Sequence, residues 1–314
     1  MSIAPYLEEL KDLSKDVSAT GLAQLSGVDG EEAGELRDAW PGIPAERRRE
    51  VVSRLVELAE ENVEMDFYAV LCHALTDEDA AVRERAVSGL WESDDRRTIP
   101  RLIDRLTNDD AKGVRAAAAV VLGHFAQLAE SGKLIERDKE RVYVGLMETL
   151  RNQQEPVEVR RRALEAVAPF QTSEVRDWVR WAYGSDAPLL RQSAVFAMGK
   201  NCDPAWLPTV VEELSSHDPA MRFEAANAAR ELAGEEAVPQ LADLVQDTDR
   251  QVAMAALQAL GGIGGARARK MLRGFAAMSD DDAVREAAEE SLRLMQSEEA
   301  DFFALDPQRL DGES

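Results

Sequence analysis

Polar and apolar positions recur along this chain with a period near 31 residues. A two-residue step, most often Val-Arg, stands at 82–83, 114–115, 159–160, 190–191, 221–222 and 284–285, and residues 252–253 (Val-Ala) keep the same register. Successive steps are 32, 45, 31, 31, 31 and 32 residues apart. A fixed period of this size is typical of an array of similar supersecondary units.

Each step opens the buried face of a predicted helix. The residue three positions after the step is always alanine, and the residue seven positions after it is always apolar. These positions lie on one helical face, and a small residue at its centre lets a neighbouring helix approach closely. The alanines are Ala86, Ala118, Ala163, Ala194, Ala225, Ala256 and Ala288.

A polar turn precedes each of these helices, as in SSHDPAM at 215–221. Asp and Ser in such a turn cap the exposed amides of the helix that follows. A shorter helix comes before the turn, and Pro100, Pro208 and Pro239 mark helix starts because proline is tolerated in a first turn. The pattern predicts helical pairs, with degenerate copies at 31–75.

The acidic turn, the Val-Arg step, the alanine and the Leu/Met-Gly ending resemble HEAT repeats, in particular the short type named after phycobilisome lyases. The resemblance covers about residues 76–295. It implies an all-α fold, a right-handed α-solenoid of about eight helical pairs. We expect capping helices at 1–30, the repeat solenoid at 31–295 and an acidic tail at 296–314.

The glycine-rich stretch ALGGIGG at 259–265 fits neither the dinucleotide fingerprint, which needs its third glycine where Arg267 stands, nor the P-loop, which needs its second glycine where Ala266 stands. Gly261 lies eight residues past its step, as Gly123 and Gly199 do. This spacing predicts that Gly261 ends one helix and that its neighbours loosen the turn into the next.

The chain carries 60 acidic and 37 basic residues, a net charge of −23. Such a charge repels nucleic acid and anionic membranes and favours a basic protein or peptide partner. Arginine dominates the basic residues; a halophilic source and a GC-rich genome both account for this. The sequence has no apolar run long enough for a membrane span, and two cysteines, Cys72 and Cys202, make no disulfide framework. We expect a cytoplasmic protein.

Three histidines, His73, His124 and His217, stand without metal-ligand spacing. The His-Glu pairs with which some HEAT-like enzymes bind two irons are missing, as is the Gly-x-Ser-x-Gly motif. We therefore expect no catalytic residue, no metal and no cofactor. Bilin lyases share the repeat, but no pigment-binding residue can be transferred to this chain.

The resemblance places the second helix of each pair on the concave side of the solenoid. Aromatic residues beside arginine are typical of binding hot spots. The predicted partner-binding residues, at offsets that face away from the core, are Phe196, Lys200, Phe223, Asn227 and Arg230, with Trp91, Arg161 and Arg162 at similar offsets earlier in the chain. The alternative is that Phe196 and Phe223 pack on each other between repeats.

Other features favour structural roles. Trp178 and Trp181 share a helical face and are predicted to be core. The arginines of the recurring step are expected to pair with turn aspartates of adjoining repeats. The extra sequence at 127–141 is interpreted as a helix extension, and Phe302, Phe303 and Leu305 of the tail as a cap on the last repeat.

Taken together, these features predict a non-catalytic scaffold that presents a repeat surface to a protein or peptide. Two alternatives stay open. One is a lyase-type enzyme or subunit that acts on a cofactor-bearing protein; the other is an assembly factor for a larger complex.

Overall fold

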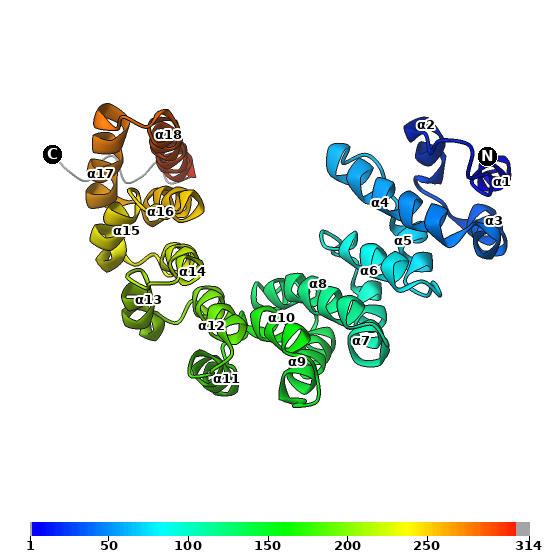
Figure 1. The fold of residues 1–314 in the computed structure, drawn as a ribbon, viewed down its shortest axis with the longest axis horizontal. Helices are drawn as coiled ribbons and strands as arrows, with labels where there is room; N and C mark the ends of the chain where they lie inside the picture. The colour runs from blue at the N-terminus through cyan, green and yellow to red at the C-terminus, as the bar shows by residue number, and fades with distance from the viewer. Residues whose placement is uncertain (1, 306–314) are drawn as a thin grey trace. The chain divides into compact units, whose positions relative to one another are not determined.

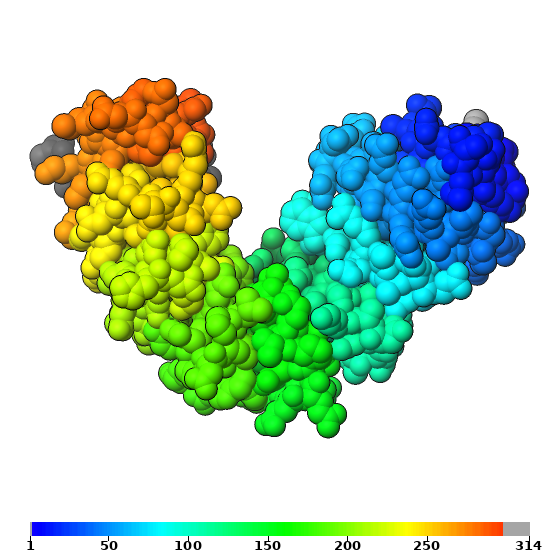
Figure 2. All heavy atoms as spheres, in the orientation of Figure 1, coloured from blue at the N-terminus to red at the C-terminus, as the bar shows by residue number. Residues whose placement is uncertain are grey.

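The structure, a computed structural model, describes residues 2–305, and the side chains of residues 2–297. The chain divides into two compact units, Met1–Phe170 and Gln171–Ser314. In the described residues every regular element is a helix, and within each unit the elements follow one another in chain order, as the colours in Figure 2 show. The predicted tail residues 306–314 lie outside the described residues, while Phe302, Phe303 and Leu305 belong to the last helix, with side chains that are not described.

Unit 1 begins with two short helices and continues with four helical pairs. The short helices are α1 (Ala4–Glu9) and α2 (Ala19–Leu22). The pairs are α3 (Gly30–Ala39) and α4 (Ala45–Glu61), α5 (Tyr68–Ala74) and α6 (Ala80–Ser88), α7 (Ile99–Asn108) and α8 (Lys112–Glu130), and α9 (Glu136–Arg151) and α10 (Val157–Val167). The second helices, α4, α6, α8 and α10, pack on one another in succession and form one layer (Figure 1).

Unit 2 holds four more pairs built in the same way. They are α11 (Ser173–Tyr183) and α12 (Pro188–Asn201), α13 (Leu207–Glu213) and α14 (Pro219–Glu231), α15 (Val238–Leu244) and α16 (Arg250–Ile263), and α17 (Gly265–Met278) and α18 (Asp282–Leu305). Here α12, α14, α16 and α18 form the layer of second helices, and the first helices cover its other side (Figure 1). The predicted helical-repeat fold is confirmed, and α18 runs through the expected boundary at residue 296.

The buried face follows the predicted register. All seven alanines of the pattern are 0 % exposed, and the apolar residues just before them in the step, from Val82 to Val284, are all buried. The turns cap the helices as expected: the Asp79 carboxylate accepts from the amides of Ala81 and Val82, and Asp249 does the same for the start of α16. Side-chain caps of this kind satisfy amides that the helix itself leaves without a partner.

The prediction for Gly261 is wrong in one respect. The residue lies inside α16, which ends at Ile263, and the turn is made by Gly264 (φ 71°) and Gly265 (φ 77°). A Cβ atom on Gly261 would lie 3.0 Å from Cβ of Ser291 in α18, and one on Gly199 would lie 2.7 Å from Cα of Ala228 in α14. Glycine stands at this offset because the backbones of successive second helices nearly touch there.

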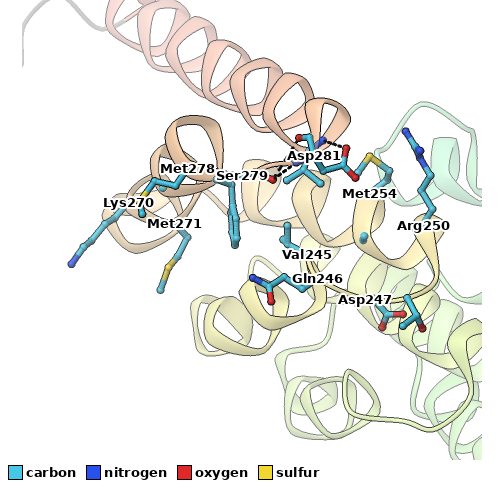
Figure 3. A pocket seen from close by; sticks show the side chains of 15 residues that line it. Val245, Gln246, Asp247, Arg250, Met254, Lys270, Met271, Met278, Ser279 and Asp281 are labelled. Carbon is cyan, nitrogen blue, oxygen red and sulfur yellow. Dashed lines mark hydrogen bonds between the residues drawn. The ribbon is translucent and has the colours of Figure 1, made fainter.

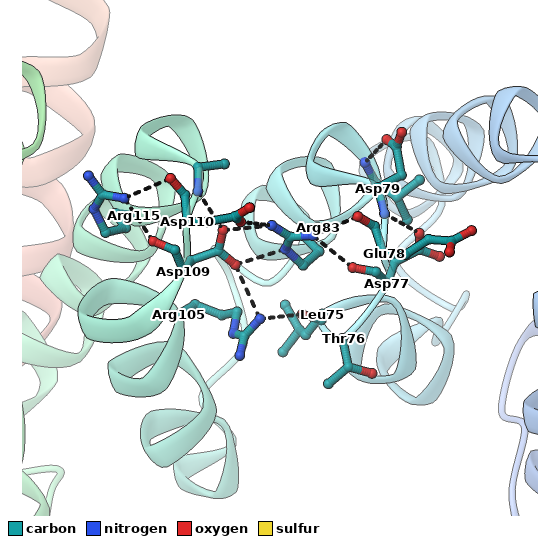
Figure 4. Close-up of polar contacts among 12 residues, drawn as sticks. Leu75, Thr76, Asp77, Glu78, Asp79, Arg83, Arg105, Asp109, Asp110 and Arg115 are labelled. Atoms are coloured by element: carbon teal, nitrogen blue, oxygen red, sulfur yellow. Dashed lines mark hydrogen bonds and ion pairs between the residues drawn. The ribbon is translucent and has the colours of Figure 1, made fainter.

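The predicted arginine ladder is confirmed at two of its rungs. Arg83 donates two hydrogen bonds of 2.8 Å to the carboxylate of Asp109 in the next turn and a third, also of 2.8 Å, to the carbonyl oxygen of Asp77 (Figure 4). Arg222 repeats this arrangement with Asp247 at 2.7 and 2.9 Å. The Arg222 guanidinium lowers the pKa of Asp247. Bidentate pairs of this kind fix one repeat against the next.

Other arginines of the step depart from that prediction. Arg115 donates to Glu155 at 2.7 Å, so a glutamate takes the place of the aspartate. The buried Arg160 donates to the carbonyl oxygen of Leu150 at 3.1 Å, and Arg285 pairs with Asp282 of its own helix. The extra sequence near 127–141 extends α8 to Glu130 and starts α9 at Glu136, as the helix-extension interpretation predicts.

Candidate protein-binding surfaces

The predicted residues of unit 2 lie together on α12 and α14 and are half-buried. Lys200 Nζ lies 5.9 Å from the centroid of the Phe196 ring and 3.0 Å from Glu231 Oε1. Arg230 lies 3.4 Å from the same carboxylate. The cations of this surface are therefore already paired within the protein.

The remaining two of those residues, Phe223 and Asn227, sit one turn apart on α14. Asn227 Nδ2 donates to the Phe223 carbonyl oxygen at 3.1 Å, so this side chain is occupied by its own helix. The Phe223 ring is half-buried, as is Phe196. The surface offers aromatic area, and its polar groups are largely committed.

The predicted residues of unit 1 form a separate group. Arg161 and Arg162 make ion pairs with Glu165, at 3.3 and 2.8 Å, within α10. Trp91 is 49 % exposed, but the helical offset assigned to it is wrong, because α6 ends at Ser88 and Trp91 lies in the turn that follows. The structure thus brings Arg161 and Arg162 together and places Trp91 on another element.

The prediction that Trp178 and Trp181 are core is wrong for Trp181, which is 44 % exposed. The core face of α11 is formed by Val175, Val179 and Ala182, all 0 % exposed. The two tryptophans do share a face, with ring centroids 5.1 Å apart in an edge-to-face arrangement, and it points away from the core.

A groove that sequence reasoning missed lies between the turn after α15 and helix α17 (Figure 3). It has a volume of about 710 Å³, and the turn from α17 into α18 contributes Ser279 and Asp281 to its lining. Apolar side chains from several elements line it: Val245, Met254, Met271, Phe275 and Met278. Met278 is 82 % exposed, so the apolar lining continues to the protein surface.

The charged side chains around this groove differ in whether they form ion pairs within the protein. Of its carboxylates, Asp247 is paired with Arg222, whereas Asp281 accepts from the amides of Ala283 and Val284 at 2.8 and 3.4 Å and has no ion-pair partner in the described part of the chain. Its cations, Arg250 and Lys270, are exposed and have no ion-pair partner within the described part of the chain. They lie toward opposite ends of the groove (Figure 3).

Helix α17 is basic over residues 267–273. It carries Arg267, Arg269, Lys270 and Arg273 and no acidic residue. Among residues 2–297, no carboxylate forms an ion pair with Arg267, Lys270 or Arg273. One basic helix on a chain of net charge −23 is a local inversion of the overall field.

A second groove, of about 680 Å³, lies in unit 1 among α3, α5 and α7, and is lined in part by Arg37, Tyr68, Cys72, His73 and Arg101. Burial raises the pKa of the Cys72 thiol and lowers the pKa of His73. Both groups are therefore held neutral near pH 7, which suits neither a thiolate nucleophile nor a charged binding residue.

Clusters of His, Cys, Asp and Glu able to hold a metal ion are not found among the described residues. None of the helices over this part of the chain combines the length and the apolar character that crossing a bilayer requires.

Comparison with solved structures finds matches over most of the chain, and one of them has a TM-score above 0.5. The complex of CpcE and CpcF of phycocyanin lyase from Nostoc sp. PCC7120 aligns with a TM-score of 0.53 at 17% identity, covering 90% of this chain and 98% of that chain. Importin beta aligns with a TM-score of 0.48 at 14% identity, covering 88% of this chain and 44% of that one. Human deoxyhypusine hydroxylase aligns with a TM-score of 0.37 at 20% identity, covering 93% and 98%.

A search of curated proteins finds no match. The family model for HEAT repeats matches residues 68–137 and 207–293, which together make up half of the chain. Both ranges show the alanine-centred helical pairs, the capped turns and, within each, one rung of the arginine ladder described above. The chain belongs to the HEAT-repeat family.

Proposed function

We propose that this chain is a non-catalytic protein-binding scaffold and that its principal docking site is the groove beside α17. The observation that carries the proposal is the groove itself: an open, methionine-lined surface with two cations at its ends that have no ion-pair partner among residues 2–297. Methionine side chains adapt their shape to a partner, and they are common at surfaces that bind protein segments. A stacked-repeat fold supports this use because its surface grows with each repeat.

The second-helix surface at Phe196 and Phe223 is a second candidate for the same function. Its charged groups are already paired, so a partner would gain mainly aromatic contact there. Replacing both rings by alanine is expected to weaken partner binding while the melting temperature stays nearly unchanged. A lower melting temperature with unchanged binding would assign these rings to the core.

The experiment is affinity purification of the tagged protein from its own host, in parallel with a groove variant. The variant is Met278→Asp with Met271→Gln, and the matched control is Leu189→Asp on α12, a leucine that is 46 % exposed outside the groove. A partner retained by the wild type and the control, and lost by the groove variant, supports the proposal. A partner retained equally by all three would refute the groove as the docking site.

The same eluates test the alternatives. A chromophore in the absorbance spectrum, or a metal by elemental analysis, would support a lyase-type enzyme or subunit. The CpcE–CpcF likeness is one of fold and transfers no activity to this chain. A partner that leaves the complex once a larger assembly has formed would support an assembly factor in place of a permanent subunit.

A further inference from the structure

We propose that the groove beside α17 binds an acidic amphipathic segment of a partner protein, with apolar side chains on the methionines and carboxylates on Arg250 and Lys270. The inference rests on the proposed function and specifies its partner. It runs against the partner that net charge alone predicts, because a charge of −23 favours a basic one.

The charged groups that line the groove differ in whether they already have an ion-pair partner within the protein. Asp247 receives both guanidinium bonds of Arg222, whereas Asp281 accepts only backbone amides that cap α18, so Asp281 is the one carboxylate of the lining without a cation among residues 2–297. Arg250 and Lys270 are exposed and unpaired within residues 2–297. The net unmet charge of the groove is therefore positive, and a carboxylate meets it.

Much of the apolar lining of the groove comes from one face of α17. Met271, Phe275 and Met278 follow one another at spacings of four and three residues, so they share one face of the helix. Met254 of α16 and Val245 complete the lining. An amphipathic helix laid in such a groove places its apolar positions on this lining and its polar positions at the rim.

Together, the two features require a ligand that is apolar on one side and acidic at its edges. Nucleic acid has the charge but would leave the methionines without apolar contact. A basic amphipathic segment has the apolar side but brings its cations against Arg250 and Lys270. A partner segment rich in Leu or Phe and in Glu or Asp satisfies both.

The test uses the full chain and three fluorescent 16-residue peptides, with binding followed by fluorescence anisotropy. The first peptide has leucines at i, i+3, i+4 and i+7 and glutamates elsewhere. The second replaces the glutamates by lysines, and the third keeps the glutamates and replaces the leucines by serines. We expect the first peptide to bind about tenfold tighter than either of the others, with an affinity that falls as salt is raised.

Charge reversal of the rim supplies the sharper readout. Arg250→Glu with Lys270→Glu should invert the preference between the glutamate and lysine peptides. Both side chains are exposed and unpaired in the described structure, so the fold does not depend on them. The matched control, Lys112→Glu with Arg267→Glu, changes net charge equally outside the groove lining and should keep the wild-type preference.

Several results would overturn the inference. They are tighter binding of the lysine peptide, equal binding of the serine peptide, binding of neither leucine peptide, or the same inversion in the control variant. A DNA oligonucleotide that competes for the rim would make the ligand a nucleic acid. A peptide of residues 296–314 that binds tighter than the glutamate peptide would make the occupant the C-terminal segment of this chain and not a partner protein.

The two proposals fail in different ways. If the groove variant loses its host partner while the lysine peptide binds better, the groove is a docking site and the acidic partner is wrong. If the host partner is retained by the groove variant, the docking site itself is wrong, whichever peptide binds.

Discussion

The close approach of successive second helices can be tested with a single methyl group. Gly199 lies inside α12, where a Cβ atom would stand 2.7 Å from Cα and 3.0 Å from Cβ of Ala228 in α14. Gly274 lies inside α17 with no atom within 4 Å of its would-be Cβ. Glycine to alanine is thus the same chemical change in two helix interiors with opposite surroundings.

The two substitutions should change stability in opposite directions. Alanine improves helix propensity by about 1 kcal/mol at either position, because it removes the excess flexibility of glycine. At Gly199 the added methyl meets backbone, and overpacking of this kind costs about 1–3 kcal/mol. We expect Gly199→Ala to destabilise by about 1 kcal/mol net and Gly274→Ala to stabilise by about 1 kcal/mol.

Calorimetry of the two variants and the wild type measures the effect. For a unit of this size, 1 kcal/mol corresponds to a shift of about 3 °C in melting temperature. The transition of unit 2 should therefore fall in Gly199→Ala and rise in Gly274→Ala. Equal stabilisation by both substitutions would refute the close contact between α12 and α14.

Three further predictions concern one rung of the arginine ladder, the helix-capping residue Asp79 and the core. Asp109→Asn removes the buried one of the two carboxylates paired with Arg83, the other being the exposed Asp110, and should destabilise by about 2 kcal/mol in urea unfolding; a change near zero would show that the Arg83–Asp109 pair adds no net stability. The hydrogen bond from Arg49 lowers the pKa of Asp79 to about 2. Because this pKa lies below the unfolded value of about 4, the pair stabilises the fold above pH 4 and is lost as the pH falls toward 2; stability measured against pH should show this slope, and Asp79→Asn should reduce it. Ala225→Leu should overpack the core and cost about 1–3 kcal/mol by thermal unfolding; unchanged stability would contradict the repeat register.

Much of the fold could be predicted from the sequence because several residues in each repeat independently indicate the same helical register. The alanine at the centre of the buried face, the apolar residue before it and the capping aspartate all agree within one repeat. The ladder was predictable for the same reason: Arg83 and Asp109, like Arg222 and Asp247, stand at fixed places in neighbouring repeats. Agreement among local signals is what makes such a fold specific.

Other features depend on distances that a repeat pattern does not contain. Glycine at the offset of Gly199 and Gly261 is compatible with a helix end and with a close helix contact, and only the spacing of the helices decides between them. The exposure of Trp181 depends on which face of α11 meets its neighbours, and a spacing of three residues says only that Trp178 shares that face.

The groove could not be read from the sequence because its lining comes from different helices. Met254, Met271 and Met278 share no spacing that sets them apart. One signal was present: the run from Arg267 to Arg273 carries four cations and no acid in a chain that is strongly acidic elsewhere. This run matches no phosphate-binding motif, whereas the contrast between its positive charge and the acidic rest of the chain indicates a contact surface.

The most direct test of the scaffold account is site-specific photocrosslinking in the host. A photoreactive amino acid placed at Met278, 82 % exposed in the groove, is compared with one placed at Val63, 95 % exposed outside it. The account predicts a discrete protein adduct at Met278 and none at Val63. No adduct at Met278, or the same adducts at both positions, would contradict the claim that this groove holds a partner.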